Sequence, residues 1–368
     1  MLQNKKHFVQ YYKSPMNFSI EKFGKPFNIV CTARLSSYLE SRLPPKNKYR
    51  PFTPDPQQME LAPDVSGNTI NGLGEVEVTK PKIVYWAKEP DTIPHGKMQK
   101  WFYTVDPGLP DFSKQRQKRL EIQNISLPPV SKEPSIYTSD IWSKKLEKFV
   151  SDGVCEKIGV AEMDQAWVFD GYTVSQSRII VTGVQHNFEN IKLAPEPEAG
   201  AEVMRQYTRA ASSAVEIASW LHSEGWEAKP LTGPMAITLT MIPAAIAAGF
   251  GELGKHGSII NPELGSSFRL SAVLTDAPLP LSEPVSHGVD DFCSACRVCE
   301  DACPPFAIIP EKKTVRGVEK WYVDFDKCLP FFNQHQGCGI CIAVCPWSRP
   351  GVGLNLAEKL ERKRKRMN

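Results

Sequence analysis

Cysteine is the residue type in this chain whose spacing points most directly to chemistry. Of the ten cysteines, eight lie between residues 293 and 345. The first four follow the pattern Cys293-x2-Cys296-x2-Cys299-x3-Cys303-Pro304. Spacings of two let consecutive thiolates turn around one corner of an iron–sulfur cube, and the spacing of three sends the fourth thiolate across to a neighbouring cluster. The run therefore predicts two [4Fe-4S] clusters.

A second, incomplete copy of the pattern follows the first. It ends Cys338-x2-Cys341-x3-Cys345-Pro346, and its expected first position holds His335 instead of a cysteine. We assign the missing thiolate to Cys328, which leaves all eight clustered cysteines in use. The predicted ligands of the first cluster are Cys293, Cys296, Cys299 and Cys345. The predicted ligands of the second cluster are Cys303, Cys328, Cys338 and Cys341.

Zinc is the alternative metal, because four-cysteine zinc sites also use spacings of two. Two interleaved Cys-x2-Cys-x3-Cys-Pro endings favour iron and sulfur. We interpret His335 as a solvated or hydrogen-bonded loop residue, since a cysteine is available as the ligand. Cys31 and Cys155 stand apart from the group and are interpreted as ordinary buried thiols.

The composition is that of a globular chain without a strong charge bias. Of its 368 residues 41% are hydrophobic, and 44 basic residues stand against 41 acidic ones. Six of the basic residues lie in the last ten positions, so the rest is close to neutral and predicts no nucleic-acid partner. We interpret the basic end as a solvated helix end or a frayed terminus, with docking of an acidic partner as the alternative.

The N-terminus and the most apolar window bear on location. The N-terminus carries neither a secretory pattern nor a twin-arginine pair, so we expect a cytoplasmic protein, or one whose signal has been removed. The apolar window 234–250 is interrupted by Pro243 and is shorter than the roughly 20 residues of a spanning helix. We expect it to be a buried core element, and we expect no stable membrane insertion.

The pattern along the chain predicts four parts. Residues 1–139 are rich in proline and read as an irregular N-terminal extension that packs on the core. Residues 140–285 alternate helices (139–154 and 198–222) with strands (178–185 and 268–275), which indicates an α/β or α+β domain. Residues 286–350 hold the cysteines, and residues 351–368 form the basic C-terminal tail.

Glycines between 247 and 281 allow close backbone approach to a flat or anionic group. Gly249, Gly251 and Gly254 have the G-x-G-x-x-G spacing of a dinucleotide site. The match is weak, because no strand precedes it and no acidic residue ends a strand about 20 residues later. Taken alone, these glycines indicate a helix end and a turn.

Five motifs together carry a family resemblance: GFGELGKHGSIINPELGSSFRL, LTDAPL, FCSACRVCEDACPPFAI, WYVDFDKC and CGICIAVCPW. In this order, over about residues 140–350, they resemble the corrinoid-dependent reductive dehalogenases. The resemblance implies a nitroreductase-like core that binds cobalamin base-off, followed by a ferredoxin-like module with two clusters. The implied corrinoid contacts are Gly249, Gly251, Glu252, Gly254 and His256. The D-x-H-x-x-G motif of other cobalamin proteins is absent here, as it is in the family.

The resemblance also implies two catalytic residues, Tyr207 on the long helix and Arg269 after the glycine-bearing turn. A phenol can donate a proton, and a guanidinium beside it stabilises the phenolate that is left. A core tyrosine and a structural ion-pair arginine are the alternatives for these two positions.

The implied reaction is R–X + 2e⁻ + H⁺ → R–H + X⁻ on an organohalide substrate. Because no flavin or plant-type ferredoxin domain is fused to the chain, we expect an external electron donor, either a ferredoxin or flavodoxin or a reductase. One rival function is that of an epoxyqueuosine reductase, an enzyme that acts on tRNA. Such an enzyme is expected to use a carboxylate in the segment after the long helix, and the only acidic residue of that segment here is Glu227. The other rival is a non-catalytic iron–sulfur electron carrier.

Overall fold

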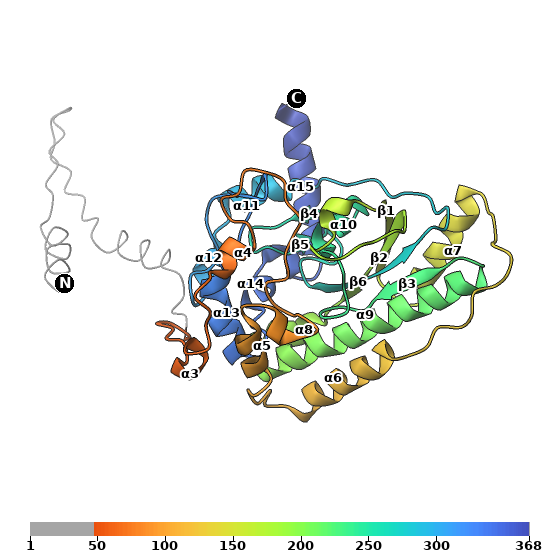
Figure 1. Ribbon diagram of the computed structural model, residues 1–368. Helices are drawn as coiled ribbons and strands as arrows, with labels where there is room; N and C mark the ends of the chain where they lie inside the picture. The colour runs from red at the N-terminus through yellow and green to blue at the C-terminus, as the bar shows by residue number, and fades with distance from the viewer. Residues whose placement is uncertain (1–47, 368) are drawn as a thin grey trace, which may run out of the picture. The chain divides into compact units, whose positions relative to one another are not determined.

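An antiparallel sheet forms the centre of this computed structural model, which describes residues 48–367. Its four strands are ordered β1-β2-β6-β3, and every neighbouring pair is antiparallel (Figure 1). Their bounds are β1 Lys157–Glu162, β2 Arg178–Gln185, β6 Phe268–Thr275 and β3 Ala228–Leu231. The predicted strands 178–185 and 268–275 are confirmed as β2 and β6. The mixed class is confirmed too, and the antiparallel pairing makes it α+β.

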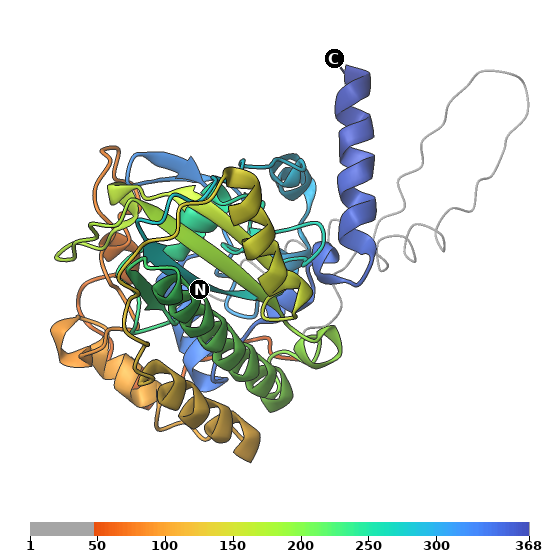
Figure 2. The ribbon, with the colours of Figure 1, turned by 90° about the vertical axis from the view of Figure 1, so that its right-hand side faces the viewer.

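Both faces of the sheet are covered, which explains why β2 reads as a continuous apolar run. Ile180 packs against α7 (Ser139–Ser151) and α9 (Pro197–Ser223). Ile179 and Val181 belong to the cluster on the other face, with α10 (Met241–Ala247). This alternation follows from the two-residue period of a strand. Figure 2 shows α7 and α9 on the same side of the sheet.

The long helix α9 closely follows its predicted bounds of 198–222. Buried alanines such as Ala211 and Ala214 let it lie close to the sheet. Just past its end, Gly225 adopts φ +81°, and a Cβ there would lie 2.4 Å from the carbonyl oxygen of Glu133. Glycine is therefore required where the helix ends.

The apolar window 234–250 is confirmed as a core element. Leu239, Ala244 and Phe250 in it are fully buried, and α10 is its only helix among the described residues. No helix within residues 48–367 is both long and apolar enough to cross a bilayer.

The expectation of an irregular N-terminal extension needs correction within the described part. Residues 48–139 contain α3 (Pro56–Met59), α4 (Gly67–Ile70), α5 (Gly96–Phe102) and α6 (Pro110–Gln123). The 14-residue helix α6 runs along α9 (Figure 1). Its sequence, PDFSKQRQKRLEIQ, has few apolar positions, so it lacks the amphipathic period that would predict a helix.

The cysteine-bearing part consists of short elements. They are α11 (Val289–Ala295), α12 (Val298–Ala302), α13 (Phe325–Gln334), α14 (Ile340–Ala343) and the hairpin β7 (Lys313–Val315) and β8 (Val318–Lys320). The basic tail forms the helix α15 (Val352–Met367). The remaining elements are α8 (Phe188–Ile191), β4 (Glu252–Leu253), β5 (Ile259–Ile260) and 3-10 turns at Pro90–Thr92, Gln165–Trp167 and Pro346–Ser348.

Candidate active site and metal centres

The first predicted cysteine group borders one cavity. Cys293 from α11, Cys296 and Cys299 from the α11–α12 region, and Cys345 before the turn at Pro346–Ser348 all line it. Burial raises the pKa of Cys293 to about 12, and the nearby thiols of Cys345 and Cys296 raise it further. The structure thus brings together the four residues assigned to the first cluster.

The second group packs in a neighbouring buried region. Cys303, Cys328 and Cys341 pack together with Ile308. Burial raises the pKa of Cys341 to about 12, with further contributions from Cys328 and Cys303. Cys338 likewise has a raised pKa, because of burial first and then the nearby Cys341, Cys328 and Cys303.

The two groups lie next to each other, since Cys299 lines the cavity of the first group and also packs with Cys303 and Cys341 of the second, and the division of the ligands between two clusters stays a prediction. Burial raises the pKa of Cys299, and the largest contribution from another thiol comes from Cys341 of the second group. No three His, Cys, Asp or Glu side chains within residues 48–366 form a group that could hold a single metal ion. The sulfurs of the first group instead border a space, as the ligands of a polynuclear cluster do.

His335 is occupied by contacts within its own helix region. Its ring stacks on Phe331 with 3.9 Å between ring centroids, and its Nδ1 lies 2.9 Å from the carbonyl oxygen of Phe331. Burial lowers its pKa. These contacts agree with a hydrogen-bonded residue, and the assignment of the ligand position to Cys328 stays a prediction. Cys155 is buried in an apolar cluster, and Cys31 lies outside the described residues.

A buried ion pair lies beside the first group. The Nζ atom of Lys255 is 2.5 Å from Oε1 of Glu300 and 3.0 Å from the carbonyl oxygen of Cys296. The two side chains are 2% and 9% exposed, so the pair ties the β4–β5 loop to α12 without contact with bulk water. Lys255 also lines the cavity of the first group.

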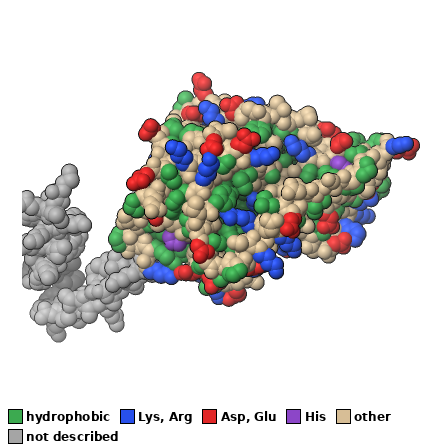
Figure 3. Space-filling model, turned by 60° about the horizontal axis from the view of Figure 1, so that its bottom comes forward, with side chains coloured by type: hydrophobic (Ala, Val, Ile, Leu, Met, Phe, Trp, Pro, Cys, Tyr) green, Lys and Arg blue, Asp and Glu red, His purple; other side chains and the backbone are tan. Residues whose placement is uncertain are grey.

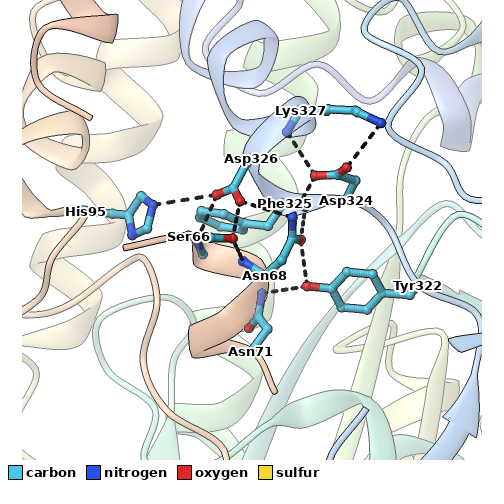
Figure 4. Close-up of polar contacts among 10 residues, drawn as sticks. Ser66, Asn68, Asn71, His95, Tyr322, Asp324, Phe325, Asp326 and Lys327 are labelled. Carbon is cyan, nitrogen blue, oxygen red and sulfur yellow. Dashed lines mark hydrogen bonds and ion pairs between the residues drawn. The ribbon is translucent and has the colours of Figure 1, made fainter. Parts of the chain in front are cut away.

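Polar side chains of the N-terminal part fix the start of α13, the helix that carries Cys328 (Figure 4). Asn68 accepts hydrogen bonds from the hydroxyl of Tyr322 (2.9 Å) and the backbone N–H of Phe325 (2.8 Å). Its amide donates to the carboxylates of Asp324 (2.8 Å) and Asp326 (3.0 Å). Asp324 in turn caps α13 by accepting from a backbone N–H in its first turn.

Tyr207 and Arg269 meet at the wall of a separate pocket. Tyr207 extends from α9 and Arg269 from β6, and the guanidinium carbon lies 4.6 Å from the centre of the phenol ring. The enclosed volume of the pocket is about 210 Å³. Gly337 and Gly339, on either side of Cys338, also line it. The two predicted catalytic residues are thus close together, beside the loop of the second cysteine group.

Two further basic residues line this pocket and were missed by the sequence reasoning. They are Arg116 and Arg119, which lie three residues apart on α6 and therefore on one face of the helix. Arg119 is 5% exposed, and its guanidinium carbon lies 5.6 Å from the centre of the Tyr207 ring. In Figure 3, basic side chains lie inside a hollow bordered by hydrophobic ones. Nothing in the polar sequence of α6 signals this role.

The five predicted corrinoid contacts do not line the pocket of Tyr207. Gly249 (φ +75°) and Gly251 (φ +124°) need their conformations for local packing, since a Cβ on Gly251 would lie 2.1 Å from a carbonyl oxygen of β5. The carboxylate of Glu252 accepts from the backbone N–H of His287 at 2.5 Å. Contacts within the chain therefore account for these three residues, and their contact with a corrinoid stays a prediction.

Gly254 and His256 lie nearer the first cysteine group. A Cβ on Gly254 would lie 2.7 Å from a side-chain carbon of Ile260. His256 lines the cavity of the first group, and its Nδ1 accepts from the backbone N–H of Ser258 at 3.2 Å. Burial lowers the pKa of His256 to about 4, so the ring is neutral at physiological pH. Both residues border the predicted iron–sulfur region, and their role toward a corrinoid also stays a prediction.

Comparison with known proteins supports the interpretation of both regions. The 4Fe-4S dicluster domain family matches residues 292–348. A tetrachloroethene reductive dehalogenase of Desulfitobacterium hafniense is 32% identical over 218 residues, which cover 55% of this chain and 39% of that protein. An epoxyqueuosine reductase of Escherichia coli (strain K12) is 35% identical over 124 residues, 29% of each protein. The chain thus spans about two fifths of the length of the first relative.

Solved structures give the same fold. A catabolic reductive dehalogenase in complex with 3-bromo-4-hydroxybenzoic acid superposes with a TM-score of 0.66 and 22% identity, covering 82% of this chain and 46% of that one. A second reductive dehalogenase, described with a mechanism for B12-dependent dehalogenation, has a TM-score of 0.60 and 23% identity over 67% of this chain and 38% of the other. With the sequence relatives and the dicluster domain, these matches show that the chain is similar to reductive dehalogenases in sequence over the aligned part and shares their fold.

Proposed function

We propose that this chain catalyses reductive dehalogenation, R–X + 2e⁻ + H⁺ → R–H + X⁻. The observation that carries the proposal is the position of Tyr207 and Arg269 at the wall of a pocket that reaches both neighbours of Cys338. A proton donor and a thiolate group that can hold an electron-transfer centre therefore border the same space. The reaction needs both.

The two cysteine groups fit [4Fe-4S] clusters. The first cluster would be held by Cys293, Cys296, Cys299 and Cys345, which share one cavity. The second would be held by Cys303, Cys328, Cys338 and Cys341, which share one buried region. Clusters of this type supply single-electron transfer. Their proximity to each other and to the pocket supports a short path for electrons that an external donor delivers to the chain.

The lining of the pocket would give a corrinoid no histidine, cysteine or carboxylate ligand from the protein. Because a structural neighbour is described as B12-dependent, we carry the cofactor over to this chain. When bound, a corrinoid would supply the low-valent cobalt that reduces the carbon–halogen bond.

Tyr207 is the proposed proton donor for the carbon that loses its halide. The side chain is half-buried, so it can face a substrate in the pocket while its ring stays packed. Arg269 makes no ion pair with an acid among residues 48–366, and its Nε atom is buried without a hydrogen-bond partner there. Its charge is therefore available to stabilise the phenolate that forms. Apolar walls exclude water from the transfer.

The epoxyqueuosine reductase alternative lacks support in the pocket. The segment after α9 contributes Pro234 and Met235 to the wall, but no carboxylate. Glu227, the acid of that segment, has a side chain that is 80% exposed. We therefore retain dehalogenation as the single proposal.

An anaerobic assay tests this function against the electron-carrier alternative. The full chain is reconstituted with iron, sulfide and cobalamin, its metals are counted, and halide release is measured with a strong reductant over halogenated phenols and alkenes. We expect about eight irons, one cobalt and halide release that requires cobalamin. Eight irons without cobalt uptake or halide release would leave only an electron carrier.

A further inference from the structure

The helix α15 carries a row of unpaired basic side chains. Lys359, Lys363 and Arg366 lie four and three residues apart, so they share one face of the helix. All three are exposed, and none forms an ion pair with a residue between 48 and 366. We call these three residues the basic stripe. The helix dipole favours a cation in the last turn, which accounts for Arg366, but it acts over about one turn and does not account for Lys359.

The acids of α15 do not neutralise the basic stripe. Glu361 pairs with Lys365 at 2.6 Å, and Glu358 lies 3.9 Å from the guanidinium of Arg362. With about 3.6 residues per turn, both acids lie on the side of the helix that faces away from Lys363. The positive charge of the stripe is therefore open to a partner from outside the chain.

The apolar face of α15 packs on the first cysteine group. Leu356 and Leu360 belong to the same cluster as Cys293 and Cys345. Lys359 directly precedes Leu360, so the basic stripe begins beside this cluster. Figure 2 shows the rest of α15 extending away from the central sheet. A protein bound to the stripe would thus be held about one helix diameter, roughly 10–12 Å, from the packed face.

The fold removes the feature that a lipid surface would need. A helix that lies on a bilayer inserts a free apolar face into it. In α15 this face is occupied, because Leu356 and Leu360 pack against the core. The exposed carboxylates of Glu358 and Glu361 would also meet anionic headgroups unfavourably. An acidic protein needs only the basic stripe, which is free.

The position of the first cysteine group fits the entry of electrons. The pocket of Tyr207 is lined by both neighbours of Cys338, which belongs to the second group, and by no cysteine of the first group within the described chain. Electrons that enter at the first group would therefore pass through the second group toward the pocket. Ala295 and Arg297, on either side of Cys296, are exposed, so this part of the first group reaches the surface.

We propose that the basic stripe docks an acidic electron-carrier protein, which delivers electrons one at a time to the cluster of the first group. The inference rests on the proposed dehalogenase function and names the kind of partner that supplies its electrons. In each encounter the carrier is oxidised by one electron and the cluster is reduced by one electron, so two encounters serve one halide. Carboxylates of the carrier would pair with the stripe, and such pairing chiefly raises the rate of association.

The test uses the full chain loaded with iron, sulfide and cobalamin. The probe is a plant-type [2Fe-2S] ferredoxin, a small acidic protein that carries one electron. Stopped-flow absorbance gives the rate constant for reduction of the loaded chain by reduced ferredoxin at several salt concentrations, and calorimetry gives the binding of oxidised ferredoxin. Dithionite serves as a small reductant that needs no docking surface. Vesicles of phosphatidylcholine with phosphatidylserine probe the alternative of an anionic membrane.

Two triple variants with the same net charge are compared. The stripe variant replaces all three residues of the basic stripe by glutamine. The matched control replaces three exposed lysines of α6 and α7 that form no ion pair within residues 48–366. The stripe variant is Lys359→Gln, Lys363→Gln and Arg366→Gln, and the control is Lys114→Gln, Lys118→Gln and Lys144→Gln.

We expect the stripe variant to be reduced by ferredoxin about 10- to 100-fold more slowly at low salt, because steering by complementary charge raises association rates by about 10- to 1000-fold. The dependence of this rate on salt should weaken for the same reason. Binding of oxidised ferredoxin should weaken as well. The control should behave like the unmodified chain, and reduction by dithionite should change little in either variant, which shows that the clusters are intact.

Equal rates with ferredoxin for the stripe variant and the unmodified chain would overturn the inference. Equal losses in both variants would also overturn it, because net charge and not the stripe would then be responsible. Vesicle binding that requires the stripe, with unchanged ferredoxin rates, would assign the stripe to a membrane instead. Halide release driven by dithionite tests the dehalogenase function separately. Stripe-dependent reduction in a chain that releases no halide would support the docking surface and refute that function.

Discussion

Replacing Tyr207 by phenylalanine removes only the hydroxyl group that we propose as the proton donor. The ring keeps its packing and its contacts with the guanidinium groups of Arg269 and Arg119, whose carbons lie 4.6 and 5.6 Å from its centre. The hydroxyl has no hydrogen-bond partner within residues 48–366, so its loss leaves no buried polar group unsatisfied. We therefore expect a change of less than about 0.5 kcal/mol in the free energy of unfolding.

The effect on turnover should be much larger. A positioned general acid contributes about 10²- to 10⁴-fold, which corresponds to roughly 3–5 kcal/mol of transition-state stabilisation. We expect kcat for halide release to fall by this factor in Tyr207→Phe. The KM should change little, because the walls of the pocket stay in place.

The matched control is Tyr103→Phe, which removes a phenol hydroxyl from the same pocket. The Tyr103 hydroxyl lies 3.7 Å from the sulfur of Met235 and is not assigned to the reaction. Both variants are compared with the unmodified chain by steady-state halide release under anaerobic conditions, after their iron and cobalt contents have been matched. If Tyr207→Phe keeps full turnover, or if Tyr103→Phe loses as much, the assignment of the proton donor is wrong.

Three further predictions follow from other parts of the structure. Cys328→Ala should reduce the iron content from about eight to about four per chain, whereas His335→Ala should keep about eight irons. Loss of iron only in the His335 variant would show that His335, and not Cys328, is the ligand. Asn68→Ala removes four hydrogen bonds at the start of α13. This substitution should lower the free energy of unfolding by about 2–4 kcal/mol. Asn71→Ala should cause a smaller loss, because the side chain of Asn71 makes one hydrogen bond, which is 3.3 Å long. Equal melting temperatures of the two variants would contradict this prediction. The pKa of His186 is lowered well below 6.5, first by burial of the side chain and then by the nearby charge of Arg269. Above pH 6.5 the neutral ring stabilises the fold, and this contribution is lost as the pH falls below that value. The free energy of unfolding should fall by up to about 1.4 kcal/mol per pH unit between pH 7 and pH 5, and His186→Gln should reduce this slope. Equal slopes in the variant and the unmodified chain would contradict the assignment.

The cysteine groups were predictable because ligand spacing is a local property of the sequence. Two residues between thiolates fix their separation almost independently of the fold, so Cys293, Cys296 and Cys299 could be assigned together. Cys328 has no such spacing to the others and was assigned by counting. The strands β2 and β6 were predictable because both faces of the sheet are buried, which leaves long apolar runs.

The basic side of the pocket could not be predicted, because it depends on how distant segments pack. Arg116 and Arg119 lie on a polar helix whose sequence resembles a solvent-exposed one. Only the packing of α6 on α9 turns these two side chains toward Tyr207. At Gly249 and Gly251, carbonyl oxygens of the chain itself require the absence of a Cβ, which agrees with a turn, and contact of these glycines with a corrinoid stays a prediction.

The most direct test of reductive dehalogenation is the product formed in deuterated water. The reconstituted chain is given a measured number of electrons and a halogenated substrate, and the product is analysed by mass spectrometry. The proposed reaction predicts two electrons consumed per halide released and one solvent deuterium on the carbon that carried the halogen. A hydroxyl group on that carbon, or halide release without electron consumption, would contradict it.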